Sequence, residues 1–350
     1  MSAASVLTPA GLCERGCRLG TALAFAAAVL LQPASALAQS PPAERMTIDS
    51  RPIERFRIGS DETRFGPFEF VGGLSMASRG RHFGGLSGFR YLAPGSDFIG
   101  VTDTGFWFFG RIERNDDRQP MGVTDFRMTP MVDAAGAPLA GKQEADAEGL
   151  EVHGGIATVS FERQHRVTEF ALQPDAMGRP LRDVDFLVPR RELRQNRGFE
   201  TVARAPEDSM LAGARVIVAE RSIDEDGNLF AAILEGPLKG VFKVARGGDF
   251  DVTDGAFLPD GDLLLLERRF SMAQGVAMRL RRIEADTIRP GGLADGPVLL
   301  EADMAYQIDN MEGLDVWRRE DGALMVSLVS DDNHSILQRN LYLEFQLVDE

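Results

Sequence analysis

The sequence predicts an all-β protein, a single β-propeller of four-stranded blades. The first observation is a recurring phrase, in which an acidic or small polar residue, often followed by Gly, precedes an apolar run. Its key positions 87, 148, 200, 254 and 312 are 61, 52, 54 and 58 residues apart. Repeats of four strands at roughly this spacing are typical of propellers.

A second phrase follows each copy of the first by 13 to 20 residues. It is a β-rich run that ends in an acid, and the five acids are Asp103, Glu162, Glu220, Glu267 and Asp331. This distance fits one strand, a turn and a second strand. Further strand-like runs, such as Phe106 to Ile112, and turn signals, such as Asp226-Gly227-Asn228, bring each repeat to four strands.

The repeats predict five motif-bearing blades, or six if the N-terminal stretch forms a blade of its own. The last repeat has only 39 residues from Glu312 to the C-terminus, enough for three strands. We therefore expect an N-terminal strand, from Phe68 to Leu74 or from Ile53 to Ile58, to pair with the C-terminal strands and close the ring, because an open ring exposes strand edges. An irregular β-sandwich is the alternative architecture, and the only expected helices are short turns near Arg190 to Arg194.

The N-terminus resembles an export signal. Arg15 and Arg18 precede an apolar run from Leu19 to Leu31, and Ala36-Leu37-Ala38 forms a small-x-small cleavage site. We expect a signal peptide over residues 1–38, a flexible segment over 39–52 and the propeller domain over 53–350. The mature chain would be periplasmic or secreted, with no membrane span after signal removal; a retained N-terminal anchor is the alternative.

Composition narrows the function further. The chain has 350 residues, with 38 Lys+Arg against 53 Asp+Glu and a formal charge of -15, which argues against a nucleic-acid partner. Both cysteines, Cys13 and Cys17, fall in the expected signal. The mature protein would therefore have no disulfide and no cysteine nucleophile or ligand. We expect a monomer that acts on a small molecule.

The strand order of a propeller predicts that the two phrases meet. The inner strand of each blade lines the central channel and the second strand runs antiparallel to it, so the first strand begins where the second ends. One channel mouth should then collect both sets of side chains. They are Ser87, Glu148, Glu200, Asp254 and Glu312 from the inner strands and Asp103, Glu162, Glu220, Glu267 and Asp331 from the second strands.

Nine carboxylates at one mouth need compensation, since unit charges a few Å apart repel by about 4 kcal/mol at an effective dielectric near 20. Protons can neutralise some acids through raised pKa values, and Arg163, Arg221 and Arg268 can pair with others. A divalent cation is the third option, and all-oxygen donors suit Ca²⁺ or Mg²⁺. The alternative is structural: the acids cap turns, and the Glu-Arg pairs are salt bridges between blades.

Other catalytic signatures are weak. His82, His153, His165 and His334 are scattered without metal-ligand spacing. The chain has no nucleophile elbow, dinucleotide-binding phrase or P-loop, so a serine-hydrolase triad is poorly supported.

Several phrases together resemble the exported bacterial family called "esterase-like activity of phytase". The resemblance covers roughly Phe68 to Leu347 and implies a propeller-like fold with a calcium-associated phosphoesterase or esterase activity. The phrases are Phe83-Gly84-Gly85-Leu86-Ser87-Gly88, Asp146-Ala147-Glu148-Gly149-Leu150, Asn196-Arg197-Gly198-Phe199-Glu200, Leu266-Glu267-Arg268-Arg269-Phe270-Ser271, Asn310-Met311-Glu312-Gly313-Leu314 and Ser330-Asp331-Asp332-Asn333-His334-Ser335.

The leading hypothesis is a periplasmic or secreted hydrolase of phosphate or carboxylate esters that uses Ca²⁺ or Mg²⁺. Glu162 or Glu220 would act as general base, and Arg163, Arg221 and Arg268 would stabilise developing negative charge. The alternatives are a non-catalytic envelope propeller with structural calcium, which binds a ligand or protein, and a sugar-lactone hydrolase. The expected metal ligands are Glu148, Glu200, Glu312, Asp103, Asp254, Glu267 and Asp331, with carbonyl donors from Asn196, Asn310 and Asn333.

Overall fold

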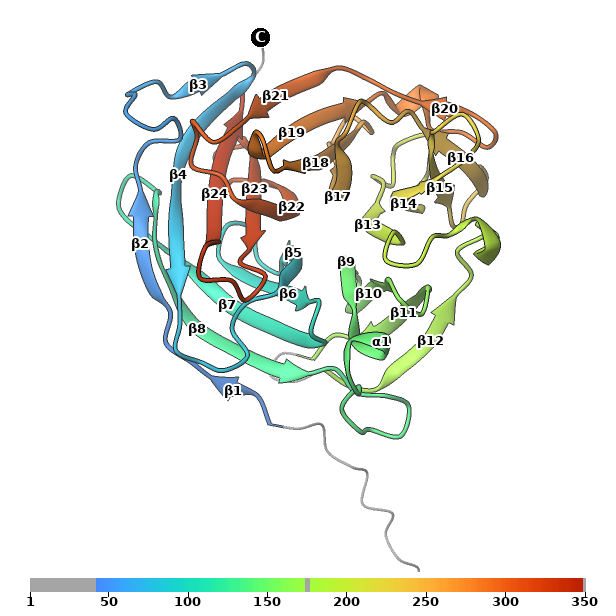
Figure 1. The fold of residues 1–350 in the computed structure, drawn as a ribbon, viewed down its shortest axis with the longest axis horizontal. Coiled ribbons are helices and arrows are strands. Elements are labelled where there is room, and N and C mark those ends of the chain that lie inside the picture. Colours follow the sequence, from blue (N-terminus) through green and yellow to red (C-terminus); the bar gives the residue numbers. More distant parts are fainter. Residues whose placement is uncertain (1–41, 174–176, 349–350) are drawn as a thin grey trace, which may run out of the picture. The chain divides into compact units, whose positions relative to one another are not determined.

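Five sheets surround a common centre and form a five-bladed β-propeller (Figure 1). The computed structural model describes residues 42–173 and 177–348, which belong to the unit Ala38–Glu350. The expected signal peptide, residues 1–38, lies outside the described residues. Within the described part, no helix is long and apolar enough to span a membrane. The predicted all-β propeller is confirmed, with five blades rather than six.

The blades share one strand order from the centre outward. The inner strands are β5 (Leu86–Tyr91), β9 (Ala147–His153), β13 (Phe199–Arg204), β17 (Asp251–Phe257) and β22 (Asn310–Arg318). The second strands are β6 (Asp97–Thr102), β10 (Ile156–Phe161), β14 (Arg215–Ile223), β18 (Leu263–Ser271) and β23 (Leu324–Asp331). The third strands are β7 (Phe106–Arg114), β11 (Arg166–Ala171), β15 (Leu229–Ile233), β19 (Gly275–Ile283) and β24 (Asn340–Leu347). The outer strands are β8 (Pro120–Pro130), β12 (Pro180–Val184), β16 (Gly240–Val244), β21 (Val298–Ala302) and β4 (Phe68–Ala77).

Short elements complete the blades. β1 (Glu44–Arg45) pairs with β8, β2 (Asp49–Ile53) and β3 (Arg64–Phe65) pair with β4, and β20 (Leu293–Ala294) runs parallel to β16. The helical elements are α1 (Lys142–Ala145) and two 3₁₀ turns, η1 (Arg190–Glu192) and η2 (Ala285–Thr287). Of these, only η1 was expected.

The N-terminal strand closes the ring. β4 pairs antiparallel with β24, so the fifth blade combines residues from both ends of the domain. This confirms the predicted closure. β1 and β2 cover the outer edges that β8 and β4 would otherwise leave unpaired. The flexible segment expected over residues 39–52 stays a prediction.

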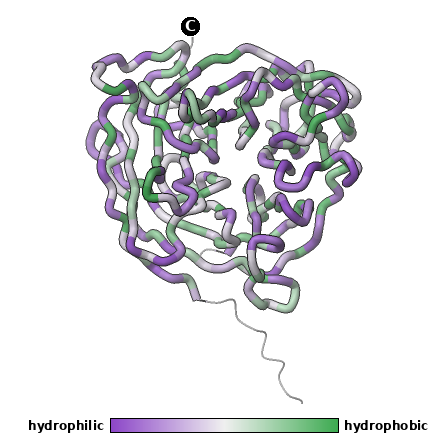
Figure 2. The backbone as a smooth tube through the Cα atoms, in the orientation of Figure 1, coloured by the Kyte–Doolittle hydropathy of each residue, from purple (hydrophilic) through white to green (hydrophobic). Residues whose placement is uncertain are grey.

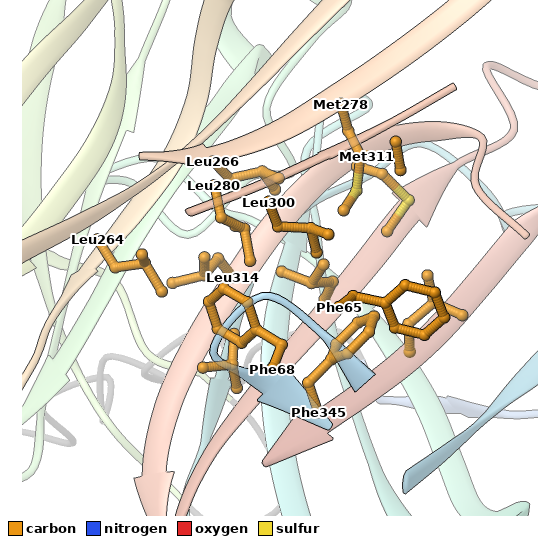
Figure 3. Packing of buried hydrophobic residues seen from close by; sticks show 14 of the residues in the cluster. Phe65, Phe68, Leu264, Leu266, Met278, Leu280, Leu300, Met311, Leu314 and Phe345 are labelled. Carbon is orange, nitrogen blue, oxygen red and sulfur yellow. The ribbon is translucent and has the colours of Figure 1, made fainter. Parts of the chain in front are cut away.

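Five hydrophobic clusters hold the blades together, one at each junction between neighbouring blades. Alternation along the middle strands builds them, because successive side chains point to opposite faces of a sheet. On β18, Leu264 and Leu266 pack toward the fifth blade, whereas Leu263 and Leu265 pack toward the third. Figure 3 shows the junction between the fourth and fifth blades. Figure 2 shows hydrophobic and hydrophilic residues interspersed along all blades.

Candidate functional site

A local irregularity in the inner strands directs side chains into the channel. The pairing of each inner strand with its second strand shifts register near its start, at Ser87, Glu148, Glu200, Thr253 and Glu312. β-Bulges of this kind bend a strand and re-aim a side chain. The repeated phrase of the sequence is therefore the signature of a bulge that turns a glutamate toward the channel in three of the five blades.

The glycine after the bulge has a separate role in packing. A Cβ on Gly149 would lie 2.4 Å from the carbonyl oxygen of Glu200 in the next blade. The same holds for Gly88 against the carbonyl of Glu148, at 2.8 Å, and for Gly313 against that of Ser87, at 2.7 Å. Contacts this short exclude any side chain, so glycine lets neighbouring inner strands approach each other and keeps the channel narrow.

The second strands end beside these bulges through equivalent backbone hydrogen bonds. The N–H groups of Asp103, Glu162 and Glu220 donate to the carbonyls of Gly85, Asp146 and Gly198, at 3.0, 2.9 and 2.7 Å. Each bond ties the C-terminal part of a second strand, or the residue directly after it, to the residue that precedes an inner strand. Carboxylates from both strands of a blade therefore share one mouth.

At this mouth lies a polar cavity of about 170 Å³, which we call the acidic cavity. Eight carboxylates line it: Asp103, Asp146, Glu148, Glu162, Glu200, Glu220, Glu312 and Asp331. Four cationic side chains also line it: Lys142, Arg163, Arg197 and Arg268. The acids outnumber the bases two to one, so full ionisation leaves an excess of negative charge.

Each cation has one acid as its nearest partner, while Lys142 Nζ is also 3.6 Å from Asp146 Oδ1 and Arg268 Nη2 is also 3.9 Å from Glu220 Oε1. Arg197 Nη1 donates to both carboxylate oxygens of Glu220, at 3.0 and 2.9 Å. The other pairs are Arg268 Nε with Glu312 at 3.1 Å, Arg163 Nε with Asp146 at 2.8 Å and Lys142 Nζ with Asp103 at 2.7 Å. Among the described residues, no cation lies within ion-pair distance of the remaining four acids, Glu148, Glu162, Glu200 and Asp331.

Burial and mutual repulsion favour the protonated acids. Desolvation raises the pKa values of Glu148 and Glu200 well above their usual range, and neighbouring carboxylates add to both shifts. Desolvation and the charge of Glu220 raise the pKa of Glu162 to about 7. The pKa of Glu312 rises to about 8, because desolvation outweighs the opposing charge of Arg268. Burial likewise raises the pKa of Asp331 to about 7.

Two sets of three carboxylates have the spacing of a metal site. One oxygen each from Asp146, Glu148 and Glu162 lies within 4.8 Å of the others, and the same holds for Glu162, Glu200 and Glu220. The Oδ1 atoms of Asp103 and Asp146 are buried without a hydrogen-bond partner among the described residues. Buried unsatisfied oxygens in an all-oxygen set fit a hard divalent cation, so this acidic cluster could hold a metal ion.

The structure brings nine of the twelve predicted site residues to the acidic cavity. They are Asp103, Glu148, Glu162, Glu200, Glu220, Glu312, Asp331, Arg163 and Arg268. Asn196 and Asn333 also line it, and Asn310 donates to Glu312 Oε1 at 2.7 Å.

The other three predicted residues, Asp254, Glu267 and Arg221, lie outside the acidic cavity. In the fourth blade the bulge falls at Thr253, one residue before the predicted acid, so Asp254 points elsewhere. Glu267 is buried and pairs with Arg279 and with Arg281, the latter at 2.7 Å.

Arg221 is within 3.4 Å of Asp251 and lines a neighbouring cleft. The fourth blade therefore contributes Arg268 to the acidic cavity and no acid.

Asp254 instead binds an arginine that plugs the channel. Arg90, on β5, donates to both carboxylate oxygens of Asp254, at 2.7 and 2.9 Å. It also donates to the carbonyls of Leu314 at 2.6 Å and Val202 at 3.2 Å, so that it joins four of the five inner strands. This buried guanidinium separates the acidic cavity from the other end of the channel.

Sequence reasoning missed Asp146, Lys142, Arg197 and Arg90. Asp146 and Arg197 belong to the phrases that precede Glu148 and Glu200, and their position two or three residues before a channel glutamate was an available signal. Arg90 carried no signal, because its partner Asp254 lies 164 residues away in the chain.

Comparison with known proteins assigns the chain to a family. The phytase-like family, described as "esterase-like activity of phytase", matches residues 81–334, which is more than half of the chain. The protein belongs to this family. No curated protein sequence matches the chain at a significant level.

Solved structures show only distant similarity. An endo-arabinase from Bacteroides thetaiotaomicron is 11% identical, with 73% of this chain and 90% of that chain covered and a TM-score of 0.45. An α-L-arabinanase from Cellvibrio cellulosa is 12% identical, with 73% and 90% covered and a TM-score of 0.41. A putative glucose dehydrogenase from Thermus thermophilus is 12% identical, with 74% and 100% covered and a TM-score of 0.36. The five-bladed assignment depends on the strand pairings alone.

Proposed function

We propose that the protein is an exported hydrolase of phosphate or carboxylate esters that depends on a divalent cation, with Ca²⁺ as the ion that best suits the donors. The observation that carries the proposal is the acidic cavity, where two three-carboxylate sets share Glu162 and where four acids lack a cationic partner among the described residues. Membership of the phytase-like family supports ester hydrolysis. The N-terminal sequence supports export to the periplasm or medium.

The ion would be held by Glu148, Glu162 and Glu200, with Asp146 and Glu220 beside them. A bound cation orients substrate oxygens and lowers the pKa of a coordinated water. Because Glu162 and Glu220 belong to the three-carboxylate sets, their expected role changes from general base to ligand. Asp331, whose pKa is raised to about 7, is the better-placed base, since it lines the same cavity and has no cationic partner among the described residues.

Arg163 and Arg268 would stabilise negative charge that develops on the substrate. In the hydrolysis, the oxygen of water bonds to the carbonyl carbon or phosphorus, and the bond to the leaving oxygen breaks. Asp331 takes one proton of the water and returns it to the leaving oxygen, which becomes the alcohol.

The test is hydrolysis of 4-nitrophenyl phosphate and 4-nitrophenyl acetate by the mature chain, first with a chelator and then with added CaCl₂. We expect activity only with calcium and a loss of at least about tenfold in Glu200→Gln, because one charged ligand is lost. Glu320→Gln is the matched control, since Glu320 is exposed in the turn between β22 and β23, at the far end of the channel. Equal turnover with chelator and calcium would overturn the proposal.

The unpaired acids also fit a structural ion in a non-catalytic binding propeller. In that case calcium would raise the melting temperature while no ester in the panel is hydrolysed. Opening of a sugar lactone without phosphatase or esterase activity would instead identify a lactone hydrolase.

A further inference from the structure

A second and much larger cleft opens next to the acidic cavity. Its volume is about 850 Å³, and it lies between the turn joining β18 to β19, the loop before β22 and the loop between β23 and β24. We call it the apolar cleft. Its apolar side chains are Ile58, Phe270, Val276, Met304, Tyr306, Ile308 and Leu337.

These side chains are exposed to an unusual degree. Phe270 is 63% exposed, Met304 59%, Leu337 87% and Ile58 57%. Only twelve large apolar side chains of the described residues are exposed, and four of them line this one cleft. A concentration of exposed apolar groups around a hollow marks a binding site more often than chance scatter does.

Two polar side chains of the apolar cleft, Arg339 and Asn310, already have hydrogen-bond partners within the protein. Arg339 donates to Gln307 Oε1 at 2.9 Å, to the carbonyl of Ile308 at 2.9 Å and to Asp309 Oδ2 at 3.3 Å. Asn310 donates to Glu312. The surface that remains for a ligand is therefore mainly hydrocarbon, which suits an alkyl or acyl chain and not a second charged group.

The apolar cleft and the acidic cavity adjoin each other. Arg268 and Asn333 line both of them. Arg268 is the cation that pairs with Glu312, so its guanidinium stands where the two spaces meet. A molecule with a polar oxygen group at Arg268 can place an alkyl or acyl chain in the apolar cleft, because about 170 Å³ holds little more than a head group. The third space beside Arg268, of about 410 Å³, is lined mainly by charged side chains and suits such a chain less well.

We propose that the substrate is an amphipathic ester, with its ester or phosphoester group at Arg268 and the acidic cavity and its alkyl or acyl chain in the apolar cleft. This inference rests on the proposed ester hydrolysis and adds the substrate class. It favours amphipathic esters over small polyanions, because a compact polyphosphate leaves the apolar cleft empty.

The first test is a chain-length series of 4-nitrophenyl esters, from acetate to decanoate, with saturating calcium. Each buried methylene should raise kcat/KM by about two- to fourfold until the cleft is full. The double variant Met304→Gln/Leu337→Gln should lose at least about tenfold more kcat/KM on decanoate than on acetate. Leu181→Gln is the matched control, because Leu181 is 54% exposed on the outer strand β12, away from the cleft. Phe270→Ser gives an independent second variant.

A flat chain-length profile with calcium-dependent acetate hydrolysis would overturn this inference and leave the proposed function intact. If no ester is hydrolysed, calorimetry of decylphosphonate and methylphosphonate with calcium separates the two questions. Decylphosphonate binding at least about a hundredfold tighter, and weakened in Met304→Gln/Leu337→Gln, would support the amphipathic ligand. Equal affinities would refute it. A series of alkyl phosphates, assayed beside the carboxylate esters, would show which class of ester the acidic cavity prefers.

Discussion

The buried contacts that Arg90 makes inside the channel should contribute a large part of the free energy of unfolding. Replacing Arg90 with Met leaves Asp254 buried without its partner, and breaking a buried ion pair in this way costs about 3–5 kcal/mol. The carbonyls of Phe89, Leu314, Val202 and Gly255 also lose a donor. The free energy of unfolding should therefore fall by an amount near the upper end of this range, about 5 kcal/mol. That is a large part of the total free energy of unfolding of a typical domain.

The assay is urea unfolding of the mature chain, with Arg45→Met as control because Arg45 is 71% exposed and makes only a surface pair at 3.7 Å. The control should not change the unfolding midpoint. Arg90→Met/Asp254→Asn should be more stable than Arg90→Met alone, since the second change removes the uncompensated charge. An Arg90→Met protein within about 1 kcal/mol of the parent would refute the idea that this arginine ties the inner strands together.

Three further predictions follow from the same geometry. Without metal, Glu200→Gln should leave the free energy of unfolding unchanged or raise it, because burial disfavours the ionised form of this carboxyl group. Glu267→Gln should instead lower it by about 2–4 kcal/mol, because Arg279 and Arg281 both lose a buried carboxylate partner. Urea unfolding in chelator compares the two variants. The pKa of Glu312 is about 8 in the folded chain against a usual 4.5, so the folded state keeps a proton that the unfolded state releases. The contribution of Glu312 to metal-free stability should therefore be greatest below about pH 4.5 and be lost as the pH rises through 8. Melting temperatures measured from pH 5 to 9, with and without calcium, would test this. A metal-free melting temperature that rises over this range would contradict it. Gly149→Ala should lower the free energy of unfolding by about 1–3 kcal/mol, because its Cβ would lie 2.4 Å from the carbonyl oxygen of Glu200. Gly122→Ala, whose Cβ would have no atom within 4 Å, should be neutral. Equal stabilities of the two variants in urea would show that the close contact between neighbouring inner strands is not needed.

The repeats in the sequence predicted the number of blades, the closure by an N-terminal strand and the shared mouth of Glu148, Glu200 and Glu312. These features depend on strand order, which alternation and turn residues encode locally. The fourth blade differs because Asp254-Gly255 looks like the Glu-Gly phrase of the other blades, while the bulge falls at Thr253. A bulge depends on the partner strand, so its exact residue cannot be read from one strand alone.

The contacts of the acids were harder to predict than their positions. The sequence predicted that arginines such as Arg268 pair with channel acids, with salt bridges between blades as the alternative, but it did not indicate the partners. Arg268 pairs with Glu312 of the next blade, whereas Glu220 pairs with Arg197 of its own blade. The apolar cleft had no sequence signature, because Ile58, Phe270, Met304 and Leu337 come from four separate loops and strand ends. Such sites exist only once the ring is closed.

The central claim is that the acidic cavity binds a divalent cation, and a crystal structure of the mature protein grown with calcium tests it most directly. We predict anomalous density in the acidic cavity, about 2.3–2.6 Å from oxygens of Glu162 and of at least two among Asp146, Glu148, Glu200 and Glu220. Ordered water at hydrogen-bond distances from these oxygens, with no anomalous signal at saturating calcium, would contradict the claim.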